Sequence, residues 1–154
     1  MRILISACLA GEACKYNGGH NRAEEILSLC QKHHWEYTAV CPEVLGGLPV
    51  PRKRSEIRDG RVVDEEGTDV TEAFCQGAEK ALELGQKFGF DVAILQPRSP
   101  SCGCREIYDG TFTGRKIPGK GVFASMLKEK GYPVYDANEV TEEELLDLEK
   151  NIGF

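Results

Sequence analysis

Short apolar runs alternate with amphipathic segments along the chain, and this alternation constrains the fold more than any other feature. The apolar runs, each short enough for a buried strand, lie at residues 2–7, 37–40, 91–96 and 132–135. In the other segments apolar residues recur every three or four positions, which is typical of helices that bury one face. We expect these helices at 22–32, 70–88, 121–130 and 141–150.

Strands that alternate with helices predict βαβ units, in which parallel strands pair and helices cover the sheet. We therefore expect an α/β fold with an open, mainly parallel, Rossmann-like sheet and helices on both faces. Two short hairpins are expected beside this sheet, because Asp59-Gly60 and Asp109-Gly110 are dipeptides that favour tight turns.

Two helices carry capping signals at their starts. Asn21 precedes the first helix, where an Asn side chain can accept from free backbone N–H groups. Thr141 and Glu144 have the spacing of a capping box at the start of the last helix. The 154 residues contain no repeat or linker, so we expect one domain, 1–154.

Charge and hydropathy exclude several classes of partner. A net charge of −6 disfavours general nucleic-acid binding, and no apolar run approaches the roughly 20 residues of a membrane span. The first residues are too short and too quickly polar for a signal peptide, so we expect a cytoplasmic protein. In that reducing compartment the seven cysteines are expected as thiols, metal ligands or catalysts rather than disulfides.

Three cysteines follow three successive strand segments. Cys8 ends the first, Cys41 follows the second, and Cys102 comes six residues after Gln96, the end of the third. The carboxyl ends of parallel strands meet at one edge of a sheet, where such folds bind ligands. The spacing therefore indicates a metal or cluster site, although chance placement of buried cysteines stays open as an alternative.

The other four cysteines have simpler interpretations. Cys30 and Cys75 lie on or beside apolar helix faces and are expected in the core. Cys14 and Cys104 lie in loops near the edge cysteines, as a fourth ligand or as spare thiols. No C-x-x-C pair is present, which disfavours a thioredoxin-like motif and a zinc ribbon.

An acid and two glycines follow Cys41 closely. Glu43 is two residues away, and Pro42 between them makes the separation short and stiff. Gly46 and Gly47 would let the chain pass close to a ligand. We therefore expect all three to contribute to the site.

Hydroxyl and basic side chains flank the same edge. Ser99 and Ser101 stand beside Cys102, although turn formation alone would also explain them. Arg52 and Arg98 are candidate partners for a substrate phosphate, since arginine matches phosphate as a fork. The alternative for Arg52 is a structural ion pair, which we expect with an acid such as Glu56.

Several motifs occur together in the order of a known family. They are the blocks at 6–11, 15–18, 41–48, 51–52, 67–71, 99–103 and 107–112. Over about residues 2–137 the chain resembles a bacterial family formerly labelled a domain of unknown function, which includes the thiouracil desulfidases. The paired blocks around Cys41 and Cys102 make the resemblance specific.

The resemblance implies a site as well as a fold. It implies a [4Fe–4S] cluster on Cys8, Cys41 and Cys102, with one iron left open. It also assigns the family's essential acid to Glu43 and its essential serine to Ser99. The implied reaction converts C=S to C=O and sulfide without redox change, on a thiolated uracil base or nucleotide. A monomer or small homo-oligomer is expected.

Two departures and two rival functions accompany this expectation. Lys15 and Asn17 stand where the family often has arginine and aspartate, and Cys14 and Cys104 are extra thiols.

A zinc-binding hydrolase would use the same three cysteines, and so would a sulfur-binding or carrier module without turnover.

Overall fold

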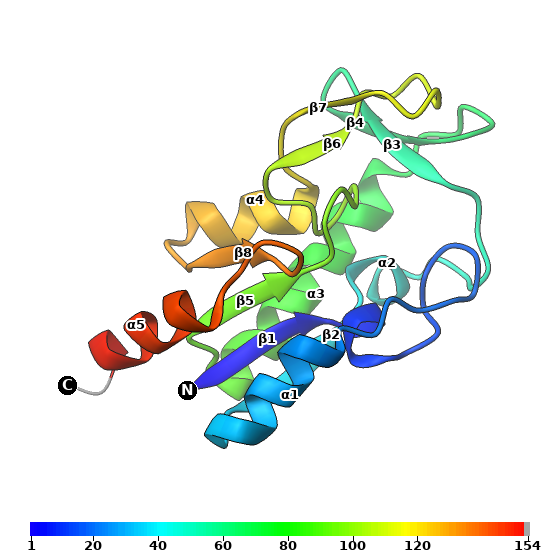
Figure 1. The fold of residues 1–154 in the computed structure, drawn as a ribbon. Helices are drawn as coiled ribbons and strands as arrows, with labels where there is room; N and C mark the ends of the chain where they lie inside the picture. The colour runs from blue at the N-terminus through cyan, green and yellow to red at the C-terminus, as the bar shows by residue number, and fades with distance from the viewer. Residues whose placement is uncertain (153–154) are drawn as a thin grey trace.

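A parallel sheet forms the centre of the computed structural model, which describes residues 1–152 (Figure 1). Its strand order is β2-β1-β5-β8, and every pair runs parallel. The strands are β1 (Arg2–Ser6), β2 (Glu36–Val40), β5 (Val92–Leu95) and β8 (Val134–Asp136). This sheet confirms the predicted α/β fold.

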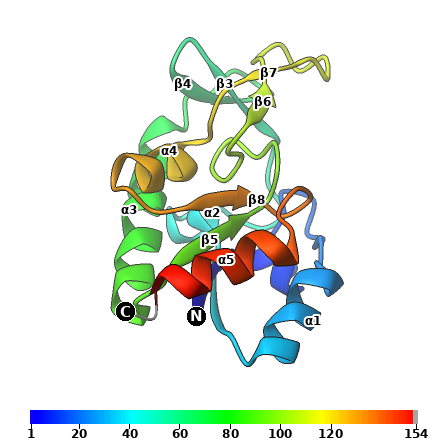
Figure 2. The same ribbon diagram turned by 60° about the vertical axis from the view of Figure 1, so that its left-hand side comes forward.

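Helices cover both faces of the sheet (Figure 2). The helices are α1 (Glu24–His33), α3 (Thr71–Phe88), α4 (Val122–Glu129) and α5 (Glu142–Ile152). Ile3 and Ile5 pack with α1 and α5 on one face, whereas Leu4 packs with α3 and α4 on the other. Successive side chains of a strand point to opposite faces, and helices cover both faces of this sheet, so β1 needs apolar residues at consecutive positions. Ile3, Leu4 and Ile5 are all fully buried.

The direction of winding reverses at β1. The chain leaves β1 through α1 to reach β2 on one side, then crosses through α3 to β5 on the other side. In open α/β sheets such a reversal leaves a crevice at the carboxyl ends of the strands, where ligands bind. Residues that follow β1, β2 and β5 therefore surround this crevice.

Both predicted hairpins are confirmed, although only the first has a tight turn. Strands β3 (Ser55–Arg58) and β4 (Arg61–Asp64) pair antiparallel around a turn at Asp59-Gly60, whose φ values of 49° and 77° fit a tight turn. Strands β6 (Glu106–Tyr108) and β7 (Lys116–Pro118) also pair, but a long loop at 109–115 joins them.

The predicted tight turn at Asp109-Gly110 is therefore wrong. The Gly110 N–H donates to the carboxylate of Glu56 at 3.0 Å, and Asp109 accepts from the Thr111 N–H at 3.0 Å. The first contact binds the loop to β3, which contains Glu56.

The helix ends show where local signals succeed and fail. The capping box is confirmed, because Thr141 and Glu144 exchange hydrogen bonds of 3.1 Å between side chains and backbone N–H groups. Asn21 does not cap α1, which begins after Ala23, and instead accepts from Lys15 Nζ at 3.1 Å. No helix within residues 1–152 has the length and apolar character that a membrane crossing demands.

Candidate active site

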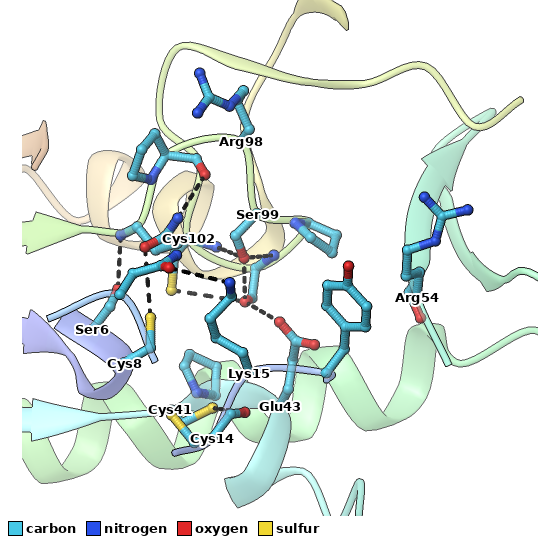
Figure 3. A pocket seen from close by; sticks show the side chains of 18 of the residues that line it. Ser6, Cys8, Cys14, Lys15, Cys41, Glu43, Arg54, Arg98, Ser99 and Cys102 are labelled. Carbon is cyan, nitrogen blue, oxygen red and sulfur yellow. Dashed lines mark hydrogen bonds between the residues drawn. The ribbon is translucent and has the colours of Figure 1, made fainter. Parts of the chain in front are cut away.

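A cavity of about 390 Å³ opens at the carboxyl edge of the sheet, and Cys8, Cys41 and Cys102 all line it (Figure 3). Cys8 lies in a 3-10 helix, Ala7–Ala10, directly after β1. Cys41 lies between β2 and α2 (Pro42–Leu45), and Cys102 lies in the loop after β5. The structure thus brings together the three cysteines that the strand pattern places at this edge.

The short helix α2 fixes the position of Glu43 relative to Cys41. Cys41 has an extended backbone with φ of −123° and forms the N-cap, and Pro42 begins the helix. Proline suits the first helical position because its fixed φ is already helical and its missing N–H is not needed there. Glu43 follows in the first turn, so its carboxylate and the Cys41 thiol face the same cavity.

Both carboxylate oxygens of Glu43 have partners. Arg52 Nε donates to Oε1 at 3.1 Å, and Ser101 Oγ donates to Oε2 at 2.8 Å. The Glu43 side chain is 15% exposed and that of Arg52 only 8%. This partly buried ion pair fixes the orientation of the acid, and the alternative pairing of Arg52 with Glu56 does not form.

Ser99 organises the Cys102 loop. Its Oγ accepts from the N–H groups of Ser101 and Cys102, at 3.1 and 3.0 Å. The hydroxyls of Ser99 and Ser101 lie 2.9 Å apart. Ser101 is therefore the serine that contacts Glu43, and Ser99 reaches the acid through Ser101.

The Cys41 and Cys102 thiols are held in their neutral form when no metal group is bound. Burial raises the pKa of Cys102 to about 12, although hydrogen bonds with Ser6 and Ser101 lower it in part. A hydrogen bond with Cys14, followed by burial, raises the pKa of Cys41 well above its usual range. A metal group must displace these protons, since the thiolate is the ligand.

Three cysteines of the cavity supply a donor set that fits an iron–sulfur cluster. Thiolates suit both zinc and iron–sulfur clusters. Within residues 1–152, no three His, Cys, Asp or Glu side chains stand close enough together to hold one metal ion. Cys8, Cys41 and Cys102 are thus the residues that would hold a cluster in this cavity.

Three further residues with predicted substrate contacts lie in different surroundings. Arg98 lines the cavity with a φ of 63°, and its side chain extends away from the cysteines in Figure 3. Gly46 and Gly47 lie outside the cavity lining. A Cβ on Gly46 would stand 2.1 Å from the Ala73 carbonyl oxygen, so Gly46 allows α2 to pack against α3.

The remaining cysteines separate into core and site positions. Cys30 is buried against the sheet as predicted, whereas Cys75 is only partly buried. Cys104 is buried beside α4, where its N–H donates to Asp136. Cys14 lines the cavity.

Several cavity residues carry no clear signal in the sequence. They include Arg54, Glu56, Gln96 and Tyr108. Gln96 accepts from the Cys8 thiol at 3.6 Å, and its place directly after the apolar β5 is the one local sign of a site. Glu56 is 5% exposed and accepts from two N–H groups of the 109–115 loop, a long-range role that no local pattern reveals.

Comparisons with known proteins identify the family. Residues 3–139 match the family model described as 2-thiouracil desulfurase. The chain is 41% identical over 150 residues to the Bacillus subtilis (strain 168) protein called uncharacterized protein YbbK, covering 91% of this chain and 98% of that one. It also matches a solved structure of the [4Fe–4S]-dependent thiouracil desulfidase TudS, with a TM-score of 0.84 and 37% identity over 98% of this chain and 97% of that one. The chain therefore belongs to the 2-thiouracil desulfurase family.

Proposed function

We propose that this enzyme is a [4Fe–4S]-dependent desulfidase that replaces the thiocarbonyl sulfur of a uracil base or nucleotide with oxygen. Water supplies the oxygen, and the sulfur leaves as sulfide, so no net redox change occurs. The observation that carries the proposal is one cavity lined by the Cys8, Cys41 and Cys102 thiols and by the Glu43–Ser101 pair. The solved TudS structure, which matches nearly the whole chain, is named as an enzyme of this type.

Cys8, Cys41 and Cys102 would hold the cluster. When bound through three cysteines, such a cluster supplies an iron without a protein ligand, a Lewis acid with affinity for a soft thiocarbonyl sulfur. Free thiols at this site require a reducing environment, so we place the reaction in the cytoplasm.

Glu43 acts as the general base toward water. Arg52 and Ser101 each occupy one side of its carboxylate, but a carboxylate offers about four lone-pair sites. Each oxygen therefore keeps an acceptor position for a water in the cavity. Because the Glu43 carboxylate is fixed in orientation, this acceptor position is already aligned with the water, which favours proton transfer as the water attacks the substrate.

The two serines extend this contact. Ser101 donates to Glu43, and Ser99 lies within hydrogen-bond distance of Ser101. A proton taken up by Glu43 can pass along the two hydroxyls toward the leaving sulfur. Because Ser99 also binds the Cys102 N–H, the same hydroxyl ties the relay to a cluster ligand.

The charge of the cavity favours a nucleotide over the free base. Lys15, Arg52, Arg54 and Arg98 all line it. Arg52 is committed to Glu43, and Arg54 lies 3.8 Å from Glu65. We assign the phosphate contact to Arg98, since a guanidinium matches one phosphate as a fork.

The test is anaerobic reconstitution followed by assays of sulfide release from 2-thiouracil, 4-thiouracil and 4-thiouridine monophosphate. We expect the reconstituted protein to be brown and to release many sulfide ions per protein chain. At most one sulfide per chain would indicate a carrier, and turnover by a colourless, zinc-containing protein would indicate a zinc hydrolase. Either outcome would overturn the proposal.

The phosphate contact has a separate test. Arg98→Ala should raise KM for 4-thiouridine monophosphate while leaving the free base nearly unchanged. Arg115→Ala, on the exposed 109–115 loop, is the matched control. Equal losses on both substrates would remove the support for a nucleotide.

A further inference from the structure

A fourth thiol stands beside the three cysteines that would hold the cluster. Cys14 lines the same cavity as those three cysteines. Figure 3 shows it next to Cys41, although 27 residues separate the two in sequence. The cavity therefore contains a fourth cysteine sulfur beside the three that would bind the iron–sulfur cluster.

The loop that carries Cys14 is held firmly in this place. Arg52 Nη2 donates to the Cys14 carbonyl oxygen at 2.9 Å, and the Cys41 thiol approaches the same oxygen at 4.0 Å. The Arg52 guanidinium also binds Glu43. The residue that orients the acid therefore fixes the Cys14 loop against Cys41 as well.

The other extra thiol in this region does not share this placement. Cys104 lies outside the cavity lining. Its N–H donates to Asp136 at 3.2 Å, its carbonyl accepts from Lys128 at 3.5 Å, and it packs among core residues of α3 and α4. The fold thus distinguishes a structural thiol from one that faces the site.

We propose that Cys14 is a fourth cysteine ligand, which occupies the open iron in the resting enzyme and leaves it when substrate sulfur binds. This inference rests on the proposed cluster and concerns the state of its fourth position. Coordination releases the proton of the Cys14 thiol, and displacement by substrate returns one, so no electrons are transferred. Four cysteine ligands are the ordinary set for such a cluster, so the resting site would resist loss of iron.

Mild oxidation of the anaerobically reconstituted protein tests this directly. An iron without a protein ligand is lost first, which leaves a three-iron cluster with a distinct electron paramagnetic resonance signal. The parent protein should keep its iron, whereas Cys14→Ala should lose a quarter of it and develop the signal. Cys75→Ala, a cysteine of α3 outside the cavity lining, should behave like the parent.

A second measurement uses the parent protein alone. Alkylation followed by mass spectrometry should find Cys14 protected in the cluster-loaded protein and reactive after 2-thiouracil is added. Equal iron loss in the parent and Cys14→Ala, or equal alkylation of Cys14 with and without the cluster, would overturn this inference alone. A parent that assembles no four-iron cluster would overturn the proposed function too.

Discussion

The contact between α2 and α3 makes Gly77→Ala an informative substitution. A Cβ on Gly77 would stand 1.8 Å from the Pro42 carbonyl oxygen and 2.9 Å from the Gly46 nitrogen. Both are backbone atoms, so no side chain can rotate out of the way. The added methyl group must therefore push α2 away from α3.

The size of the effect follows from these distances. Nonbonded contacts of carbon lie at roughly 3.5–4 Å, so relief of the 1.8 Å contact requires α2 to move by about 1.7–2.2 Å. Overpacking costs about 1–3 kcal/mol, and the better helix propensity of Ala offsets roughly 1 kcal/mol of that. The net loss of stability is therefore expected to be modest.

The loss of activity should be much larger. Glu43 lies in α2 and Cys41 forms its N-cap, so both would move with the helix. A displacement of about 1 Å at a catalytic group can lower the rate by about 10²-fold. We expect Gly77→Ala to keep its fold and to lose at least about 10²-fold in kcat.

Gly85→Ala is the matched control in the same helix. Its Cβ would meet the Phe90 side chain at 2.8 Å, far from α2 in sequence, and this ring can shift. Thermal unfolding and sulfide release should show destabilisation without a loss of kcat. Near-parent kcat in Gly77→Ala, or an equal loss in Gly85→Ala, would refute the reasoning.

Three other predictions follow from the same structure. Glu43→Gln should lower turnover by about 10²–10⁴-fold, as loss of a general base does, while visible absorption of the cluster stays unchanged; unchanged turnover would exclude Glu43 as the base. In the metal-free protein the Cys102 and Cys41 thiols keep their protons above 9.0, their ordinary pKa, whereas the unfolded chain loses them. Stability in denaturant should therefore fall as pH rises above 9.0, and less so in Cys102→Ala; equal slopes would contradict this. Thr141→Ala removes the capping box and should lower the free energy of unfolding by about 1 kcal/mol, with kcat unchanged; an unaltered unfolding midpoint would count against the cap.

Hydrophobic periodicity was sufficient to predict the sheet and its helices, because burial on both faces leaves a strong pattern. It could not predict α2, whose four residues are too few to show a period. The Asp109-Gly110 signal failed for another reason. Glu56, more than 50 residues away, binds the loop and overrides its local turn preference.

Topology also placed three cysteines at one edge from the sequence alone. The pairing of Arg52 with Glu43 could not be predicted, because an irregular loop separates them and its path depends on tertiary contacts. The same holds for the close approach of Gly46 to α3, which no local pattern reveals. Which of the two serines contacts Glu43 was equally hidden, since neighbouring loop residues point in directions that only the fold sets.

Iron content of single cysteine variants, measured after anaerobic reconstitution, tests the central claim most directly. Cys8→Ser, Cys41→Ser and Cys102→Ser should each lose most of the iron and all sulfide release from thiouracil. Cys75→Ser should retain the iron of the parent, because its thiol lies outside the cavity lining. If any of the first three variants kept a full complement of iron, the assignment of the cluster to these cysteines would be contradicted.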